Sequence, residues 1–371
     1  MWLVLRNVMA GRERKYTPRA RTQRPLGSSM TTNTPPAQSL PEPRKHDEGW
    51  FLPAPLAQRL YEKSALGVLS EDGGIVITPE ELMFCHWYRH VPLPRHDATW
   101  FGRELKHRSE LALRCIAMDV LRNGGELVVP RVNLLTRFPT LPSVTWAVRW
   151  ERHETWTKHH GFSQIRVHHA QESLDWDELH GWVNEVVSFG HRAELCVVDD
   201  EFDATVYELC FENPSGDQTT LSSLSSEQRS LVKDICTEAI PIEGGFFVEN
   251  DGDWPLSAIG LSHFSGRFLR QEEHDHLLGN QHSPHAELYS ALVNRGLLLR
   301  PGFKYGCRWR VYETDMMAEH APWLVQPRVE APRNWEEVCL SVRLAEGVNK
   351  RWLCAMRFEE TFSFLNIKRQ A

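Results

Sequence analysis

The sequence predicts an α/β (α+β) fold built from two similar units in tandem. Strand and helix patterns alternate from 144 to 203, as in an α/β domain. An internal repeat supports the duplication: 291–301 matches 120–130 at an offset of 171, and 353–367 matches 195–209 at an offset of 158. The repeated unit exceeds 100 residues, which is too long for a solenoid period. Each unit is expected to hold a small N-terminal α/β subdomain and a C-terminal domain with a mixed sheet.

Composition divides the chain into six segments. Residues 1–48 are rich in Arg and Pro and are expected to form a disordered basic arm, in which Met9 or Met30 is an alternative start. The Ser-rich stretch 213–230 is the best candidate for a linker. The remaining boundaries are 49–100 and 101–212 for the first repeat, and 231–280 and 281–371 for the second.

Local patterns justify the elements in order. In the first repeat, a helix, a Gly-containing turn and a short strand precede a second helix that starts at Thr78-Pro79-Glu80-Glu81, a capping box with proline at the first helical position. A long amphipathic helix over 103–125 and a strand over 126–132 follow. The second repeat predicts helices over 283–296 and 334–350, with strands over 297–305, 308–313, 321–326, 351–358 and 363–369.

Charge and cysteine content restrict the functional classes. The net charge is −7, yet residues 1–45 and 281–371 are both net positive, which favours an anionic ligand at one end of an acidic body. No apolar run reaches the roughly 18 to 20 residues of a membrane helix. The eight cysteines contain no CxxC pair and are expected to be buried, reduced thiols in a cytoplasmic protein.

Three residues of the last domain form a candidate catalytic set. Tyr312 ends one predicted strand, His320 begins the next and Lys350 lies between a helix and a strand, so all three can meet at one sheet edge. A phenol, an imidazole and an amine suit phosphoryl transfer without metal or cofactor, because they can act as base, acid and stabilising cation. Tyrosine is a poor base at its reference pKa of about 10, so nearby cations must favour the phenolate.

At these residues the sequence resembles the archaeal tRNA splicing endonucleases, or tRNA-intron lyases. GFKYGCRWRVY, HAPWLV and VRLAEGVNKRWLCA follow the family's three motifs in order, although the loop before His320 is short and Pro322 is unusual. The resemblance implies that Tyr312 is the general base, His320 the general acid and Lys350 the transition-state stabiliser. It also implies attack by a ribose 2'-hydroxyl that leaves 2',3'-cyclic phosphate and 5'-hydroxyl ends.

The resemblance further implies how the RNA and a second subunit are held. Arg343 falls on an arginine that grips an extruded base of the bulge-helix-bulge precursor tRNA, with Arg369 or Lys368 as its counterpart. Trp150 takes the tyrosine position in the first repeat, where Arg192 falls opposite Lys350 and His159 or His160 remains. The first repeat is therefore expected to be an inactive structural copy in a homodimer. Its acidic loop would dock on the partner subunit through Asp199, Asp200, Glu201 and Asp203.

Two other functions and two metal sites were weighed against this interpretation. A non-catalytic RNA-binding subunit would not need to retain all three residues of the catalytic set, and a metal-dependent nuclease would need paired carboxylates on adjacent strands. Two histidine groups could be taken for zinc sites, but neither has cysteine partners or an HExxH glutamate. These groups are His86 with His90, and His274 with His276, His282 and His285.

Overall fold

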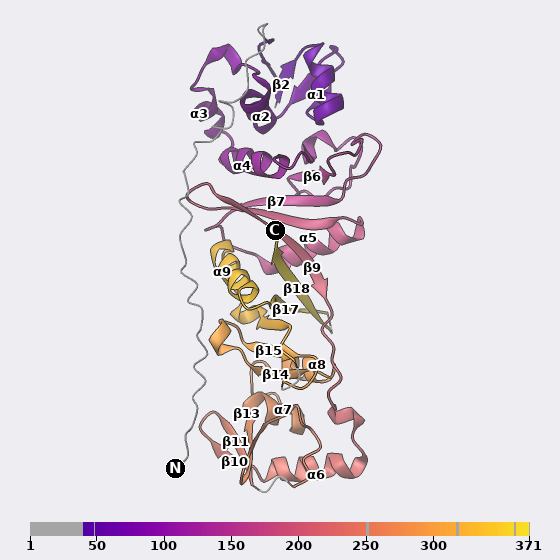
Figure 1. Ribbon diagram of the computed structural model, residues 1–371, viewed down its shortest axis with the longest axis vertical. Coiled ribbons are helices and arrows are strands. Elements are labelled where there is room, and N and C mark those ends of the chain that lie inside the picture. Colours follow the sequence, from indigo (N-terminus) through magenta and orange to yellow (C-terminus); the bar gives the residue numbers. More distant parts are fainter. Residues whose placement is uncertain (1–39, 48, 250–251, 317–318, 360, 371) are drawn as a thin grey trace, which may run out of the picture.

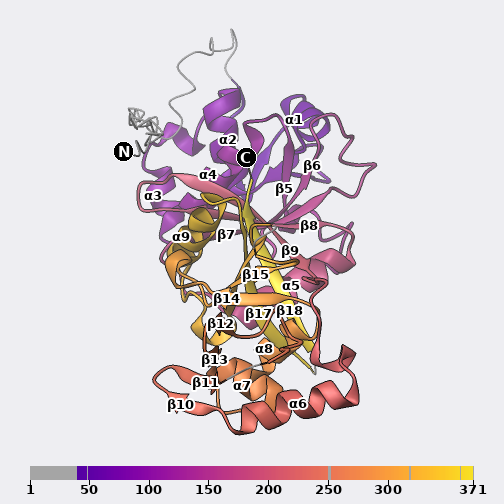
Figure 2. The same ribbon diagram turned by 60° about the horizontal axis from the view of Figure 1, so that its bottom comes forward.

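A ten-stranded mixed sheet runs through the middle of the molecule, and a small subdomain lies at each end (Figure 1). The computed structural model describes residues 40–47, 49–249, 252–316, 319–359 and 361–370. Figure 2 shows the same arrangement from another direction, with α1 and α2 at one end and α6 at the other. Both views place the large sheet between the two subdomains.

The strand order of the large sheet is the same from either end toward its centre. From one edge it runs β14 (Leu298–Pro301), β15 (Trp309–Tyr312), β16 (Trp323–Pro327), β17 (Arg351–Phe358) and β18 (Thr361–Arg369). It continues through β9 (Ala204–Glu212), β8 (Arg192–Val198), β7 (Ser163–His169), β6 (Ala147–Trp150) and β5 (Leu127–Pro130). Among the described strands, β16–β17 and β7–β8 pair in parallel and the others are antiparallel, so the α+β class with a mixed sheet is confirmed.

The two halves share one core on one face of this sheet. Helices α5 (Trp176–Ser188) and α9 (Trp335–Glu346) pack there together, over Leu195 and Leu209 of the first half and Leu365 and Cys354 of the second. The antiparallel pairing of β18 with β9 continues the sheet between the halves. Burial of apolar side chains on this scale dominates the folding free energy, so the halves are expected to stabilise each other.

The opposite face is covered separately in each half. Helix α4 (Leu111–Arg122) packs on the first half, and α8 (Ala286–Val293) packs on the second. Predicted residues 103–125 are in fact divided between α3 (Trp100–Leu105) and α4. The division has a physical reason: Trp100 of α3 and Leu111 of α4 both enter the core, but the polar residues 106–110 between them contribute no side chain to it.

The two terminal subdomains have the same strand order. One contains β1 (Arg44–His46), β2 (Gly49–Leu52), β4 (Ile75–Ile77) and β3 (Val68–Leu69), with α1 (Leu56–Ser64) and α2 (Pro79–Arg89). The other contains β10 (Ile240–Ile242), β11 (Gly245–Glu249), β13 (Gly266–Arg270) and β12 (Leu261–His263), with α6 (Ser226–Thr237) and α7 (Gln271–Leu278). Helix α2 begins at the predicted capping box of Thr78 and Glu81.

The ends of three predicted segments are corrected. Residues 1–39 and 48 of the expected basic arm lie outside the described residues, but Arg44–His46 form strand β1, which pairs with β2. Helix α6 begins inside the expected linker, because Ser225 accepts a hydrogen bond from the backbone N–H of Gln228 and completes a capping box. Strand β14 ends at Pro301, because the chain turns after Gly302 into a 3-10 helix over Phe303–Tyr305, where the Tyr305 N–H donates to the Gly302 carbonyl.

Candidate active site

Tyr312 is held at the end of β15 by packing on all sides. Its side chain is 7% exposed and lies in a small apolar cluster with Ala258, Leu298 and Ala321. Arg310 stands two residues earlier on the strand, so it projects from the same face. The Cζ atom of Arg310 lies 5.9 Å from the centre of the Tyr312 ring. A rigid phenol therefore has a guanidinium beside its ring.

His320 lies where the chain enters β16. Strands β15 and β16 are antiparallel, so the end of the first is next to the start of the second. His320 is exposed, whereas the following residue, Ala321, is buried against Tyr312. Residues 317–318 of the intervening loop lie outside the described part of the chain. The imidazole is therefore accessible to a substrate at the edge where Tyr312 ends.

Lys350 joins these two residues through a hydrogen bond. It directly precedes β17, which runs parallel to β16 and so begins at the same sheet edge. Its Nζ atom donates to the carbonyl oxygen of Ala321 at 2.7 Å. Ala321 is bonded to His320 and packs on Tyr312. The three predicted residues thus come together around one alanine, from three neighbouring strands.

The electrostatic environment of Lys350 favours its neutral form more than water does. Partial burial lowers the pKa of Lys350, and the nearby Arg310 guanidinium lowers it further. Arg310 therefore contacts the Tyr312 ring and lowers the pKa of Lys350. It was not among the residues predicted from the sequence. The signal was present in RWRVYE, because alternation along a strand places residues two apart on one face.

The predicted RNA-gripping arginines lie elsewhere on the second half. Arg343 is exposed on α9 and Arg369 is exposed near the end of β18. The backbone N–H of Arg369 donates to a carboxylate oxygen of Glu346 on α9 at 2.9 Å, which ties the strand to that helix. Arg343 lies near Cys339, and Arg369 lies near Tyr207. Burial raises the pKa of Cys339 and of Tyr207, and in each case the nearby arginine opposes that shift.

The predicted acidic loop is a tight turn between β8 and β9. One carboxylate oxygen of Asp199 accepts from the backbone N–H groups of Glu201 and Asp203 at 3.0 and 2.9 Å. Asp200 pairs with the His169 ring at 3.1 Å. The turn is therefore shaped by its own hydrogen bonds, and it leaves Asp200, Glu201 and Asp203 exposed.

Five of the six histidines considered as zinc ligands have ordinary hydrogen-bond partners within 3.0 Å. The pairs are His86 with Val91, His274 with Cys236, His276 with Ser290, His282 with Asp275 and His285 with Glu330. Within the described part of the chain, no group of three or more potential ligands is placed to hold a metal ion. In the same residues, no helix is long and apolar enough to span a bilayer.

The register of the strands corrects the comparison of the two halves. Arg192 and Arg351 each donate the backbone N–H to the carbonyl of the residue that precedes the facing parallel strand, at 2.8 and 2.9 Å. These two arginines therefore correspond to each other. The residue of the first half that corresponds to Lys350 is then His191, and not Arg192 as the sequence comparison predicts. The error arose because sequence matching cannot show which residues pair across a sheet.

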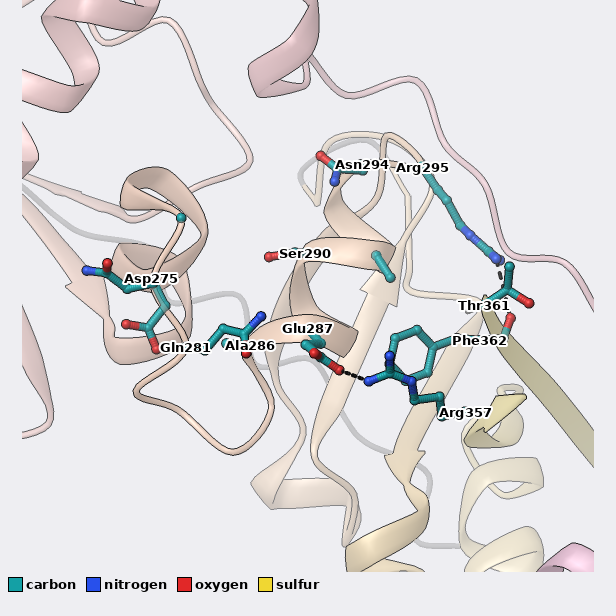
Figure 3. Close-up of a pocket in the computed structure, with 13 residues that line it drawn as sticks. Asp275, Gln281, Ala286, Glu287, Ser290, Asn294, Arg295, Arg357, Thr361 and Phe362 are labelled. Carbon is teal, nitrogen blue, oxygen red and sulfur yellow. Dashed lines mark hydrogen bonds and ion pairs between the residues drawn. The ribbon is translucent and has the colours of Figure 1, made fainter. Parts of the chain in front are cut away.

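A separate hollow of about 480 Å³ lies beside α7, α8 and the turn between β17 and β18 (Figure 3). Figure 3 shows Arg357 and Glu287 pointing toward each other across it, where they form an ion pair. Arg295 donates to the carbonyl of Phe362 at its rim at 3.4 Å. Among the described residues that line this hollow, none belongs to the set of Tyr312, His320 and Lys350. The candidate active site is thus an open sheet edge, away from this hollow.

A family model matches a segment of this second half. Residues 283–362 match the family model described as tRNA intron endonuclease, catalytic C-terminal domain. The chain is similar to the tRNA-splicing endonuclease of Thermoplasma volcanium, with 28% identity over 179 residues, which cover 46% of this chain and 53% of the relative. That of Natronomonas pharaonis is 29% identical over 184 residues, covering 44% and 54%.

A shorter match is closer in sequence. The tRNA-splicing endonuclease of Methanopyrus kandleri is 38% identical over 72 residues, covering 19% of this chain and 39% of the relative. The chain spans about half the length of the first two relatives. The segment that matches the family model, residues 283–362, contains Tyr312, His320 and Lys350. This segment is therefore similar to the catalytic C-terminal domain of the tRNA intron endonuclease family.

Proposed function

We propose that the protein is a tRNA splicing endonuclease that excises introns from precursor tRNA by transesterification without metal. The observation that carries the proposal is the shared neighbour of the three residues: Tyr312 packs on Ala321, Lys350 donates to the Ala321 carbonyl, and His320 directly precedes Ala321 in the chain. Attack on a phosphodiester needs a base, an acid and a stabilising cation, and these three groups supply one of each. The match of residues 283–362 to a catalytic domain supports the same reaction class.

The proposed reaction assigns one role to each residue. The Tyr312 phenolate removes the proton of a ribose 2'-hydroxyl, and the resulting oxygen attacks the adjacent phosphorus. A new bond forms between this oxygen and phosphorus, and the bond from phosphorus to the 5'-oxygen breaks. His320 gives a proton to the leaving 5'-oxygen, while Lys350 stabilises the negative charge on the phosphorane oxygens. The products are a 2',3'-cyclic phosphate and a 5'-hydroxyl.

Other residues are assigned to substrate recognition. Arg343 and Arg369 would grip an unpaired base of a bulge-helix-bulge RNA, since a guanidinium stacks well on a splayed base. Their exposure on α9 and β18 leaves both side chains accessible to RNA. The acidic turn that contains Asp199, Asp200, Glu201 and Asp203 would dock on the partner subunit of a homodimer. Its exposed carboxylates suit a basic surface.

The reaction is tested by cleavage of an intron-containing precursor tRNA in EDTA, followed by analysis of the product ends. Wild-type protein should cut and leave 2',3'-cyclic phosphate and 5'-hydroxyl ends. His320→Ala and Tyr312→Phe should each lower the single-turnover rate by roughly 10² to 10⁴, the usual contribution of a proton-transfer group. His107→Ala, at an exposed histidine of the first half, is the matched control and should cut normally.

Two results would refute the proposal. Cleavage that stops in EDTA, or that leaves 3'-hydroxyl and 5'-phosphate ends, would indicate a metal-dependent nuclease. Binding of precursor tRNA without cleavage by the wild-type protein would favour the non-catalytic subunit instead.

A further inference from the structure

We propose that His160 and His191 form a second binding site for a backbone phosphate of RNA, on the first half of the molecule. The site occupies the place that His320 and Lys350 take in the second half. The identity of the ligand as RNA rests on the proposed function. The location of the site rests on the strand register alone.

Three positions define the equivalence of the two sites. Trp150 and Tyr312 are each the last residue of a strand and each pairs with a leucine of the neighbouring strand. His160 and His320 each lie three residues before the parallel strand that follows, β7 or β16. His191 and Lys350 each directly precede the strand parallel to it, β8 or β17. The fold therefore brings His160 and His191 to one sheet edge, as it does for the catalytic pair.

The exposure of these residues follows the same pattern in both halves. The aromatic residue is buried, with Trp150 fully covered and Tyr312 only 7% exposed. Both His160 and His320 are exposed, and both His191 and Lys350 are half-buried. A ligand that reaches the catalytic edge of the second half can therefore reach the corresponding edge of the first.

Each histidine ring has a contact of its own, and the two rings interact electrostatically. The Gln164 Nε2 atom lies 3.3 Å from His191 Nδ1, and the His160 ring packs on Phe138 with centres 5.4 Å apart. Burial lowers the pKa of His191, and the nearby His160 lowers it further. Because the Gln164 amide donates to Nδ1 of His191, the Nε2 atom carries the ring proton and is the donor left for a phosphate oxygen, while the exposed His160 offers a second ring N–H.

The surrounding charge favours a phosphate over a cation. Exposed basic residues lie close by in the sequence or in the adjoining strand, namely Arg152, Lys158 and Arg192. Of the two acids in the same loop, Glu154 approaches the His159 ring at 3.8 Å and Glu151 is exposed. Neither carboxylate has a described contact with His160 or His191. Because Trp150 replaces the phenol, this site lacks the proposed general base and should bind a phosphodiester without cutting it.

The test measures binding separately from cleavage. The full chain is titrated with a precursor tRNA that carries 2'-deoxyribose at the cleavage sites, so that it cannot be cut. His160→Gln/His191→Gln should weaken binding roughly tenfold, the size expected for a lost charge-assisted hydrogen bond. The slope of log affinity against log salt should become shallower by about 0.9, the contribution of one phosphate contact. His107→Gln is the matched control. If the double variant does not fold, His160→Gln alone, at an exposed position, is used in its place.

Failure of this proposal and failure of the proposed function give different results. Unchanged affinity and salt slope in the histidine variants would overturn the second site, whatever the wild-type protein cleaves. Weakened binding without any wild-type cleavage would keep the second site and refute the nuclease. If a Tyr312→Phe/His320→Ala protein still cleaves, and this cleavage is lost when His160→Gln is added, the second site is catalytic. That result would overturn its assignment as a site that only binds. No RNA binding by the wild-type protein would overturn both.

Discussion

Single residues decide which half of the molecule can act as a catalyst. Tyr312 and Trp150 occupy equivalent strand ends, yet only the phenol can accept and return a proton. Lys350 and His191 are likewise equivalent, but a lysine carries a charge at neutral pH that a histidine largely does not. The backbone thus supplies two similar edges, and two side chains, Tyr312 and Lys350, distinguish the proposed active one.

Arg310 is expected to set the upper pH limit of cleavage. Lys350 must be protonated to stabilise the transition state, and its pKa is lowered first by burial and then by Arg310. Cleavage should therefore fall at a lower pH than it would with an ordinary lysine. Arg310→Gln removes one of the two causes, so the pKa of Lys350 should rise and the alkaline fall in rate should move to higher pH. Single-turnover rates across the alkaline range measure this shift.

The matched control for this experiment is Arg308→Gln. Arg308 directly precedes β15, and its guanidinium nitrogens lie 3.6 and 3.7 Å from carboxylate oxygens of Glu272 and Glu330. Its pH profile should match that of the wild type. An alkaline limb that stays in place, or moves to lower pH, in Arg310→Gln would contradict the assignment.

At the scale of elements, the same helix start is built with two different charge balances. Glu81 and Glu273 are the third residues of α2 and α7, and each carboxylate accepts a backbone N–H from a glycine, Gly67 or Gly260. Burial raises the pKa of Glu81. Burial also acts to raise the pKa of Glu273, but the ion pair with Arg270 and the hydrogen bonds from Arg270 and Gly260 together outweigh it and lower the pKa.

Replacement of these two glutamates should therefore cost different amounts of stability. Glu273→Gln removes the nearer carboxylate of Arg270, at 2.8 Å, and leaves only Glu272 at 3.9 Å; removal of one member of a buried pair costs about 3 to 5 kcal/mol. Glu81 forms no ion pair within the described part of the chain and acts on the buried Arg122 only at longer range, so Glu81→Gln is expected to cost about 1 to 3 kcal/mol for imperfect hydrogen bonding. Chemical denaturation of both variants of the full chain measures the difference. Equal losses would contradict the ion-pair argument.

The pH dependence of the Glu273 contribution has a definite sign. The folded pKa of Glu273 lies below its ordinary value, so the unfolded state binds more protons as pH falls. The stabilisation is fully present above the ordinary pKa of glutamate and is lost as pH falls through the lower folded value. The stability gap between wild type and Glu273→Gln should therefore narrow in acid.

At the scale of the whole molecule, the continuous sheet makes the two halves one structural unit. Strands β18 and β9 pair from Phe364 with Glu212 to Arg369 with Tyr207. Trp323 of the second half also donates to a carboxylate oxygen of Glu212 at 2.7 Å. The first half, with its substituted catalytic positions, thus supports the edge strands that carry Tyr312 and His320.

Neutralisation of the acidic turn should prevent the proposed dimer. Asp200→Asn/Glu201→Gln removes two exposed charges but keeps Asp199, whose carboxylate shapes the turn. The variant is expected to elute as a single chain and to lose cleavage, whereas the wild type elutes as a dimer. Light scattering coupled to gel filtration measures the mass. Glu71→Gln/Asp72→Asn, in another exposed turn, is the control, and an unchanged dimer in the first variant would contradict the assignment.

Much of this architecture could be predicted because local sequence carries its signals. The capping box at Thr78 begins α2 as expected, and Tyr312, His320 and Lys350 lie at the ends of predicted strands. Motifs that span a few residues are visible in one dimension. Two boundaries could not be predicted locally. The end of β14 depends on the hydrogen-bonded turn after Gly302, and the division between α3 and α4 depends on which side chains reach the core.

What the sequence alone determined was the α+β class, the internal repeat and the identity of three candidate catalytic residues. These follow from residue spacing and periodicity, which act over short distances along the chain. Only the tertiary structure decided that Tyr312 and Lys350 both contact Ala321, the neighbour of His320. It also decided that Arg310 lies near Tyr312 and Lys350, and that His191 is the counterpart of Lys350 in the first half. The physical reason is that pairing across a sheet and packing in a core are set by the register between distant strands.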